Sequence, residues 1–169
     1  MANRNIHYEA CFEDYLRTMG IPYVAVDEAK KALFAGVALK SFDFVVYSNR
    51  GPNLLVDVKG RKFPYISGKR RRYWENWATL DDLESLARWE EIFGQGFAGL
   101  LVFCYHLQER EAADLFSVVH PFRSSFYGMV GVWRGDYGSE CRPRSKVWGT
   151  ASVPTKKFRK LLQPIASFF

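Results

Sequence analysis

Asp57 and Lys59 stand one residue apart in an apolar segment, a spacing that brings an acid and a base to the same side of a β-strand. The segment LLVDVK, Leu54 to Lys59, has the composition of a strand. Because side chains alternate along a strand, Asp57 and Lys59 would share one face, with roughly 7 Å between their Cα atoms. The aliphatic residues would face the other way, toward apolar cover. A plain ion pair on a half-exposed strand is the alternative, since such pairs are common and contribute little stability.

Asp43 is a second carboxylate within an apolar segment. It is the only charged residue of SFDFVVYS, residues 41–48, which is also typical of a strand. The turn residues 49–53 follow, so the two segments are predicted to pair as a hairpin that brings Asp43 beside Asp57. Two neighbouring carboxylates repel each other unless a proton or a cation lies between them. Oxygen ligands of this kind suit Mg²⁺ or Mn²⁺, which makes a metal site the leading interpretation.

This arrangement resembles the PD-(D/E)xK nucleases, whose fold is restriction-endonuclease-like. Asp43 matches the first acid of the motif, and Asp57-Val58-Lys59 stands in place of the (D/E)xK triplet. Phe42 stands where the family often has proline, and the second acid is Asp rather than the more frequent Glu. The triplet alone occurs by chance in many chains, whereas its order after an acid in an apolar strand is more specific.

The family also carries a glutamate on its first helix, and Glu9 fits that position. Glu9 precedes Gly20 at a spacing that looks like the archaeal Holliday-junction resolvases, with the apolar Phe12 and Leu16 between them. Glu13, one helical turn later, is the alternative helix acid.

The resemblance implies a deoxyribonuclease, a Mg²⁺- or Mn²⁺-dependent hydrolase of phosphodiester bonds in DNA. The metal would be held by Asp43, Asp57 and the backbone carbonyl of Val58. Glu9 would bind the metal directly or through a water. Lys59 would orient or help to deprotonate the attacking water and stabilise the charge that grows on phosphorus. The implied catalytic residues are therefore Glu9, Asp43, Asp57 and Lys59.

A basic stretch with interleaved aromatic residues begins at Lys59. Between Lys59 and Arg72 the sequence has seven cations and no acid. Because the chain leaves the predicted active-site strand here, these side chains are expected to lie near bound phosphates, while aromatic rings stack on unpaired bases. A solvated cationic loop packed by its own aromatic residues is the alternative. The predicted nucleic-acid-binding residues are Arg61, Lys62, Lys69, Arg70, Arg71, Arg72, Tyr73 and Trp74, with Trp77 as a further candidate for stacking.

The elements that would hold these residues follow from hydrophobic periodicity and turn signals. A first helix is predicted at about 6–19 and a second at about 80–93. Thr155 can cap a third helix, which is predicted to end near residues 163–164. Thr79 or Asp81 is expected to cap the second helix. The segment 27–39 stays ambiguous between helix and loop. Strands besides the hairpin are predicted at 23–26, 98–106, 115–119, 129–134 and 146–153, the one at 98–106 covered on both faces.

These elements predict an α/β fold with a mixed sheet. The resemblance makes the expectation more specific: a restriction-endonuclease-like three-layer core, with a central mixed β-sheet flanked by helices. The 169 residues are expected to form a single nuclease-like domain, with a core at about 6–106 and a β-rich C-terminal extension at about 107–169. The resemblance covers roughly Tyr8 to His106 and does not explain the extension.

Charge and composition limit the kind of partner. The net charge is +6 and the pI about 9.3, which favours a polyanion such as nucleic acid. The three cysteines stand in no zinc-ligand spacing. The longest apolar run, 97–105, is too short to span a bilayer, and the first residues contain no apolar signal-peptide core. The expected protein is cytoplasmic, with DNA and not a membrane as its partner.

Two other functions stay open. A non-catalytic nucleic-acid-binding module on a nuclease-like scaffold would use the same basic stretch. A structural or interaction protein would use its aromatic tail, with Phe168, Phe169 and Trp133 in a self-association surface. A homodimer is one of the expected oligomeric states.

Overall fold

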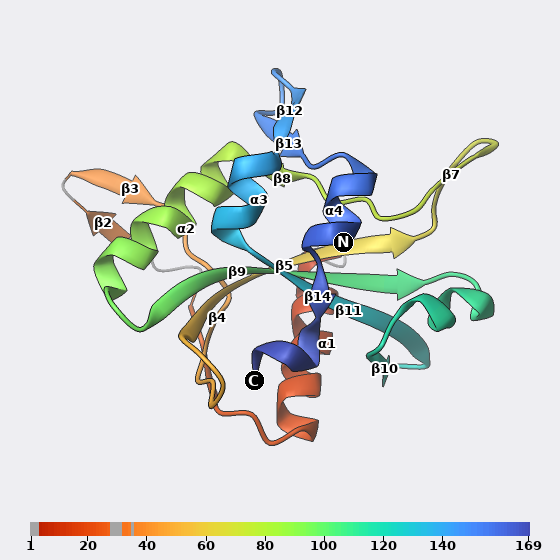
Figure 1. Cartoon of the computed structure of the whole chain (residues 1–169), viewed down its shortest axis with the longest axis horizontal. Helices are drawn as coiled ribbons and strands as arrows, with labels where there is room; N and C mark the ends of the chain where they lie inside the picture. The colour runs from red at the N-terminus through yellow and green to blue at the C-terminus, as the bar shows by residue number, and fades with distance from the viewer. Residues whose placement is uncertain (1–3, 28–31, 35) are drawn as a thin grey trace.

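A curled central sheet crosses the molecule (Figure 1). The computed structural model describes residues 4–27, 32–34 and 36–169. Within them the sheet has seven strands, in the order β1-β4-β5-β9-β11-β10, with β14 beside β11. β5 and β9 pair in parallel and the other neighbours are antiparallel, so the sheet is mixed, as predicted. The strands are β1 (Tyr23–Ala25), β4 (Phe44–Val46), β5 (Asn53–Phe63), β9 (Phe97–Leu107), β10 (Val119–Phe122), β11 (Ser125–Trp133) and β14 (Gln163–Pro164).

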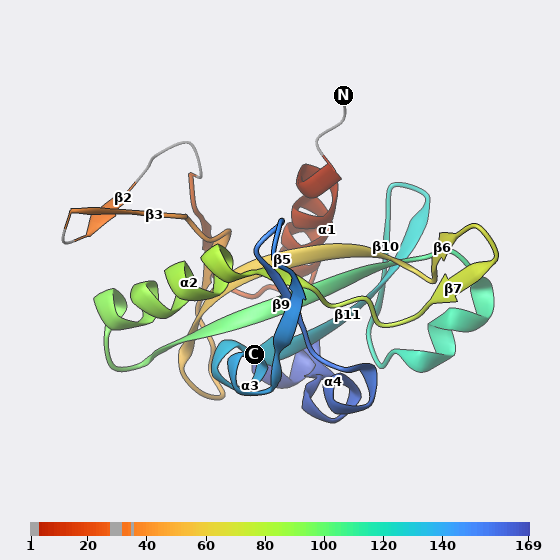
Figure 2. The same cartoon turned by 90° about the horizontal axis from the view of Figure 1, so that it is seen from above.

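Helices cover both faces of this sheet and complete three layers. Two separate apolar clusters fill the two spaces between helices and sheet. Figure 2 shows α1 on one side of the sheet and α3 and α4 on the other. The first cluster joins the sheet to α2 (Leu80–Phe93), α3 (Arg134–Glu140) and α4 (Thr155–Leu161), and the second joins it to α1 (Arg4–Thr18) and the 3-10 helix η2 (Ile165–Phe168). The predicted α/β fold with a flanked central sheet is confirmed.

α1 and α2 form where the sequence predicts them. The apolar stripe of α1 is buried, with Cys11, Phe12 and Leu16 fully covered. The helix ends at Thr18 and is followed by Gly20, whose φ of +67° suits glycine in the turn that follows. α2 begins after Thr79, whose hydroxyl accepts a hydrogen bond from the backbone N–H of Asp82 at 3.0 Å. Thr79 is thus the cap, one of the two predicted candidates.

The hairpin of β4 and β5 is confirmed, but its strands differ in length from the prediction. β4 covers only 44–46, so Asp43 lies just before the strand rather than inside it. β5 is longer than predicted and continues to Phe63. Because β4 is much shorter than β5, the residues of β5 that follow Val56 have no partner on β4, and Phe44↔Val56 is the last pair.

The chain after residue 107 contributes to the same sheet. β11 lies beside β9 along seven residues, and β10 and β14 flank β11. The predicted strand at 115–119 is wrong, because Leu115 ends the 3-10 helix η1 (Arg110–Leu115) and β10 starts only at Val119. The predicted strand at 146–153 is shorter: β13 (Thr150–Ser152) follows a turn and pairs with β12 (Arg142–Ser145) and β8 (Ala78–Thr79). The predicted cap of the last helix is wrong, because Thr155 is the first residue of α4 and Pro154 is its N-cap, without a side-chain hydrogen bond.

Two small hairpins complete the described chain. The segment predicted as ambiguous contains β2 (Ala32–Phe34) and β3 (Val37–Leu39), which pair with each other, while residues 28–31 and 35 lie outside the described residues. β6 (Tyr65–Ser67) and β7 (Arg70–Arg72) pair within the basic stretch. No helix of the described chain is long and apolar enough to cross a membrane.

Phe168 of the aromatic tail packs inward, whereas Trp133 and Phe169, the other residues of the predicted self-association surface, are partly exposed. Phe168 is 4% exposed and its ring lies 4.9 Å from that of Trp133. Phe169 also packs against the apolar cluster beneath α1. The Phe168 ring lies against Gly131 because η2 packs on β11, whereas the Phe169 ring lies beside Tyr15 of α1.

Gly60 on β5 is expected to tolerate no side chain. A Cβ atom there would lie 2.0 Å from two ring carbons of Tyr8 on α1, so the helix would have to shift. We expect Gly60→Ala to lower the free energy of unfolding by about 1–3 kcal/mol, measured by urea unfolding. Gly135→Ala is the matched control, since nothing lies within 4 Å of a Cβ at that helical position. Equal stability of Gly60→Ala and wild type would contradict this packing.

Candidate active site

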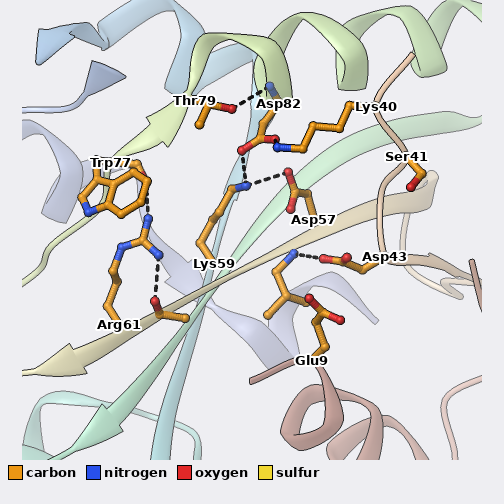
Figure 3. A pocket seen from close by; sticks show the side chains of 12 residues that line it. Glu9, Lys40, Ser41, Asp43, Asp57, Lys59, Arg61, Trp77, Thr79 and Asp82 are labelled. Carbon is orange, nitrogen blue, oxygen red and sulfur yellow. Dashed lines mark hydrogen bonds and ion pairs between the residues drawn. The ribbon is translucent and has the colours of Figure 1, made fainter. Parts of the chain in front are cut away.

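A polar cleft of about 300 Å³ opens beside β5, where the chain is about to enter β4. Side chains from α1, the segment before β4, β5 and the start of α2 converge on it (Figure 3). All four residues predicted to be catalytic line this one cleft. Its lining consists of Glu9, Lys40, Ser41, Asp43, Asp57, Val58, Lys59, Gly60, Arg61, Trp77, Thr79 and Asp82.

Asp43 occupies the edge of β5 that β4 leaves open. Its backbone N–H still donates to the carbonyl of Val56 at 2.9 Å, as the last step of the hairpin ladder. Its carboxylate Oδ2 then accepts a hydrogen bond from the N–H of Val58 at 2.6 Å, where a longer β4 would have placed a backbone carbonyl. Asp43 is 8% exposed, so this carboxylate is held in a nearly buried position. The hairpin therefore places Asp43 next to the Asp57-Val58-Lys59 triplet, as predicted.

Asp57 and Lys59 lie on the same face of β5, as side-chain alternation predicts. Lys59 Nζ is 3.0 Å from Asp57 Oδ2, and both side chains are 13% exposed. The neighbouring Val56 and Val58 instead join the apolar cluster under α1. An ion pair thus exists, but it is not the half-exposed pair of the alternative interpretation, because both groups are mostly buried.

A third carboxylate, Asp82 on the first turn of α2, extends this pair into a chain of charges. Lys59 Nζ lies 2.6 Å from Asp82 Oδ2, which is a shorter contact than the one to Asp57. The other oxygen of Asp82 pairs with the ammonium of Lys40. Lys59 is thereby fixed between two acids, one from the sheet and one from the helix.

The pKa values of these groups follow from burial and from their partners. Burial raises the pKa of Asp57, and the ammonium of Lys59 opposes that rise without cancelling it. Burial works against the charge of Lys59, but Asp57 and Asp82 outweigh it and raise the pKa of Lys59. Burial would also raise the pKa of Asp82, yet Lys59 and Lys40 lower it to about 2. The arrangement holds a protonated lysine against an ionised Asp82.

Glu9 and Glu13 lie in different surroundings on α1. Glu9 lines the cleft, and Figure 3 shows it approaching β5 from the helix below Asp43. Glu13 instead pairs with Arg17 at 3.0 Å and accepts a hydrogen bond from the hydroxyl of Tyr23 at 2.8 Å. Of the two candidate helix acids, Glu9 is the one beside the other predicted catalytic residues.

The donor atoms around the cleft suit a hard cation that keeps some of its water. Glu9, Asp43 and Asp57 offer carboxylate oxygens. In a strand the N–H and C=O of one residue point to the same side, so the Val58 carbonyl faces the open edge beside Asp43. Among the described residues, no three His, Cys, Asp or Glu side chains stand close enough together to enclose a metal by themselves. Mg²⁺ commonly takes only one or two carboxylates and completes its shell with water and phosphate, so this donor set fits it.

Arg61, two residues after Lys59, connects the cleft to a second cavity of about 770 Å³. Its guanidinium donates to the carbonyls of Gly60, at 2.7 Å, and of Trp77, and it stacks 3.9 Å from the centre of the Trp77 ring. Its Nε–H is buried and has no hydrogen-bond partner in the described structure. Arg144 approaches the same indole at 5.5 Å and lines the second cavity.

The remaining predicted nucleic-acid-binding residues divide into exposed and buried ones. Most of the basic side chains are exposed, on β5 or on the β6–β7 hairpin, and Tyr73 is 39% exposed. Arg71 pairs with Glu109, and Arg72 lies 3.8 Å from Glu75. The prediction that Trp74 contacts nucleic acid is wrong. Trp74 is 6% exposed and its ring packs on Phe63 at 4.9 Å between ring centres, so it cannot stack on a base. The exposed basic residues are Lys62, Lys69, Arg70, Arg71 and Arg72.

Sequence reasoning missed Asp82 and Lys40. Asp82 stands in the first turn of a correctly predicted helix, where an acid is ordinarily explained by the helix dipole. Lys40 lies in a segment for which no element was predicted. The useful signal was the spacing of Asp82 after the cap Thr79, which turns its side chain toward the sheet. The spacing identifies Asp82 as a site residue only when the packing of α2 on β5 is already known.

The fold is similar to that of a solved nuclease. Hjc, a Holliday junction resolvase from the archaeal hyperthermophile Archaeoglobus fulgidus, matches with a TM-score of 0.55 and 14% sequence identity, covering 95% of this chain and 96% of that chain. Hjc has the PD-(D/E)xK nuclease-like fold. No family model and no curated protein matches the sequence. The likeness therefore concerns the fold, and it extends over the C-terminal part that the sequence motifs left unexplained.

Proposed function

We propose that this protein is a PD-(D/E)xK nuclease that hydrolyses phosphodiester bonds in DNA with the help of Mg²⁺ or Mn²⁺. The observation that carries the proposal is the meeting of Glu9, Asp43, Asp57 and Lys59 in one cleft, although they come from three separate segments. The fold shared with a DNA resolvase and the net charge of +6 both support a nucleic-acid substrate.

The metal would be held by Asp43, Asp57 and the Val58 carbonyl, with Glu9 bound directly or through water. When bound, such an ion polarises the phosphate and makes water a stronger nucleophile at neutral pH. The hydrogen bond from the Val58 N–H to Asp43 keeps one carboxylate oxygen fixed at the strand edge. The second Asp43 oxygen stays oriented by that contact, which limits the reorganisation needed to bind a cation.

Lys59 supplies positive charge and hydrogen-bond donors beside the reacting phosphate. Its ammonium is fixed by Asp57 at 3.0 Å and Asp82 at 2.6 Å, so it needs little reordering when the substrate arrives. One of its three protons remains for the attacking water or a phosphate oxygen. Arg61, which lines the cleft wall, would add positive charge beside the neighbouring phosphate.

The nuclease activity is tested with the purified chain on plasmid, single-stranded and branched DNA. Cleavage is expected with Mg²⁺ or Mn²⁺ and not with excess EDTA. A variant with Asp43 and Asp57 both changed to Asn, purified in parallel, controls for contaminating nucleases and should not cleave. Absence of cleavage of all three substrates with both metals would overturn the proposal.

A non-catalytic DNA-binding module on the same scaffold is the second candidate. The exposed cations of the β6–β7 hairpin favour it, since they bind phosphates without any metal. The same double variant distinguishes the two candidates. A binding module would bind DNA in a salt-dependent manner, equally well before and after the substitutions, and would cleave none of it.

The choice between Glu9 and Glu13 is a further prediction of this function. Glu9→Gln is expected to lower the cleavage rate by about 100-fold, because it removes a charged oxygen ligand from the cleft. Glu13→Gln is the matched control on the same helix, and its contacts to Arg17 and Tyr23 lie outside the cleft, so its cleavage rate should stay near wild type. Single-turnover rates measure both. A larger loss in Glu13→Gln than in Glu9→Gln would refute the assignment.

A further inference from the structure

The β12–β13 hairpin carries the most exposed apolar side chains of the described chain. Its turn, residues 146–149, presents Val147 at 88% and Trp148 at 77% exposure. Figure 1 shows this hairpin projecting beyond α2, α3 and β8. Exposing a tryptophan to water is unfavourable, and such rings ordinarily find cover in the core or on a partner. Residues 142–152, here called the arm, therefore present a largely exposed ring to the solvent.

The charge of the arm indicates what kind of ligand fits. Arg142, Arg144 and Lys146 flank the ring, and Arg142 and Arg144 are exposed. No acid occurs between Arg142 and the last residue, Phe169. A cationic surface around an exposed indole suits an anionic chain that also offers flat aromatic rings, which is the chemistry of a nucleic acid with accessible bases.

The arm is joined directly to the candidate active site. Thr150 on β13 lies opposite Thr79, the residue that caps α2 and lines the cleft. The backbone N–H of Leu80 donates to the carbonyl of Gly149 at 2.8 Å, one residue after Trp148. The turn is thereby held beside the helix start that positions Asp82 against Lys59.

Arg144 provides a second link between the arm and the cleft. Its guanidinium lies 5.5 Å from the centre of the Trp77 ring, and the guanidinium of Arg61 lies 3.9 Å from the same centre. Trp77 lines the cleft, and with Arg144 it also lines the adjoining cavity of about 770 Å³. Arg61, Trp77 and Arg144 thus form a row of contacts that leads from the cleft to the arm.

We propose that the arm stacks Trp148 on an unpaired base while Arg144 and Lys146 bind the adjoining phosphates, so that the substrate class is DNA with unpaired nucleotides near the cut. This inference rests on the proposed DNA-directed function. Stacking on an indole tolerates any base, which gives a preference for structure rather than sequence. A base inside a continuous duplex is already covered on both sides, so fully paired DNA gains little from the exposed ring.

Binding without catalysis tests the proposal. Two fluorescein-labelled duplexes of equal length, one fully paired and one with a central unpaired loop, are titrated with the full chain in EDTA and followed by anisotropy. Wild type is expected to bind the looped duplex more tightly. Trp148→Ala should weaken binding to the looped duplex by about tenfold and leave the paired duplex little changed. Trp148→Phe should retain most of the preference, because a phenyl ring still stacks.

Phe126→Ala is the matched control, since Phe126 is also an exposed aromatic residue, at 58%, but sits on β11. It should bind both duplexes as wild type does, and thermal melting shows that each variant is folded. The proposal is overturned if Trp148→Ala binds the looped duplex as tightly as wild type, weakens both duplexes equally, or changes only the sedimentation of the chain, as a contact with a second copy would. Because EDTA prevents cleavage, loss of the stacking preference and absence of nuclease activity are separate results.

Discussion

Changing Asp57 to Asn is expected to lower metal-dependent DNA cleavage by at least about 1,000-fold while leaving the protein as stable as wild type. The substitution keeps the shape of the side chain and removes the negative charge that would bind the metal. Lys59 loses one partner but keeps Asp82 at 2.6 Å. Burial already raises the pKa of Asp57, so a neutral group of the same shape suits the site, and we expect the free energy of unfolding to change by less than about 1 kcal/mol.

Single-turnover cleavage measures the loss of activity, and urea unfolding of the same preparations measures the stability. Asp81→Asn is the matched control, because Asp81 is an exposed acid beside Asp82 on α2. It should alter neither cleavage nor unfolding appreciably. Cleavage by Asp57→Asn at the wild-type rate would remove Asp57 from the catalytic site, and the triplet would then be a structural ion pair.

Changing Lys59 to Met is expected to impair both cleavage and folding. The cleavage rate should fall by about 1,000-fold, because the cation beside the phosphate is lost. The free energy of unfolding should fall by about 3 kcal/mol, because two mostly buried carboxylates lose their common partner. Asp82 would keep Lys40, whereas the structure records no other basic side chain within ion-pair distance of Asp57 among the described residues.

A double variant separates these two effects. Adding Asp57→Asn to Lys59→Met removes the buried carboxylate that has no other basic partner within ion-pair distance among the described residues, so part of the stability should return while cleavage stays low. Lys62→Met is the control on the same strand, since Lys62 is exposed, and its stability should match wild type. If Lys59→Met unfolds in urea as wild type does, the ion pairs of Lys59 with Asp57 and Asp82 do not stabilise the site.

The sequence predicted the local arrangement of the site better than its long-range contacts. Alternation in a strand depends only on neighbouring residues, which is why the shared face of Asp57 and Lys59 could be predicted. The hairpin followed from a turn cluster of five residues between two apolar segments. The contact of Lys59 with Asp82 depends on the packing of α2 against the sheet, which no local pattern encodes.

The aromatic residues of the basic stretch illustrate the same limit. Trp74 and Trp77 stand three residues apart in one polar segment, with nothing in the sequence to distinguish them. The structure buries Trp74 beneath Phe63 and Phe116, at 4.9 and 5.2 Å between ring centres, and leaves Trp77 at the wall of the cleft. Burial is decided by strands that come together from distant parts of the chain, so the prediction for Trp74 failed.

The late start of β4 also has a consequence for solubility, because it leaves part of β5 without a strand partner on one side. From Asp57 to Phe63 the cleft-side edge of β5 has no strand partner among the described residues, which makes it a template for pairing with foreign chains. The residues along this edge include two lysines, an arginine and an acid. Charge on an open edge disfavours strand addition, because a pairing chain would have to bury it. The charged side chains proposed to act on DNA would thus also disfavour aggregation through this strand edge. Neutralising several of them together should lower the solubility of the protein before it unfolds.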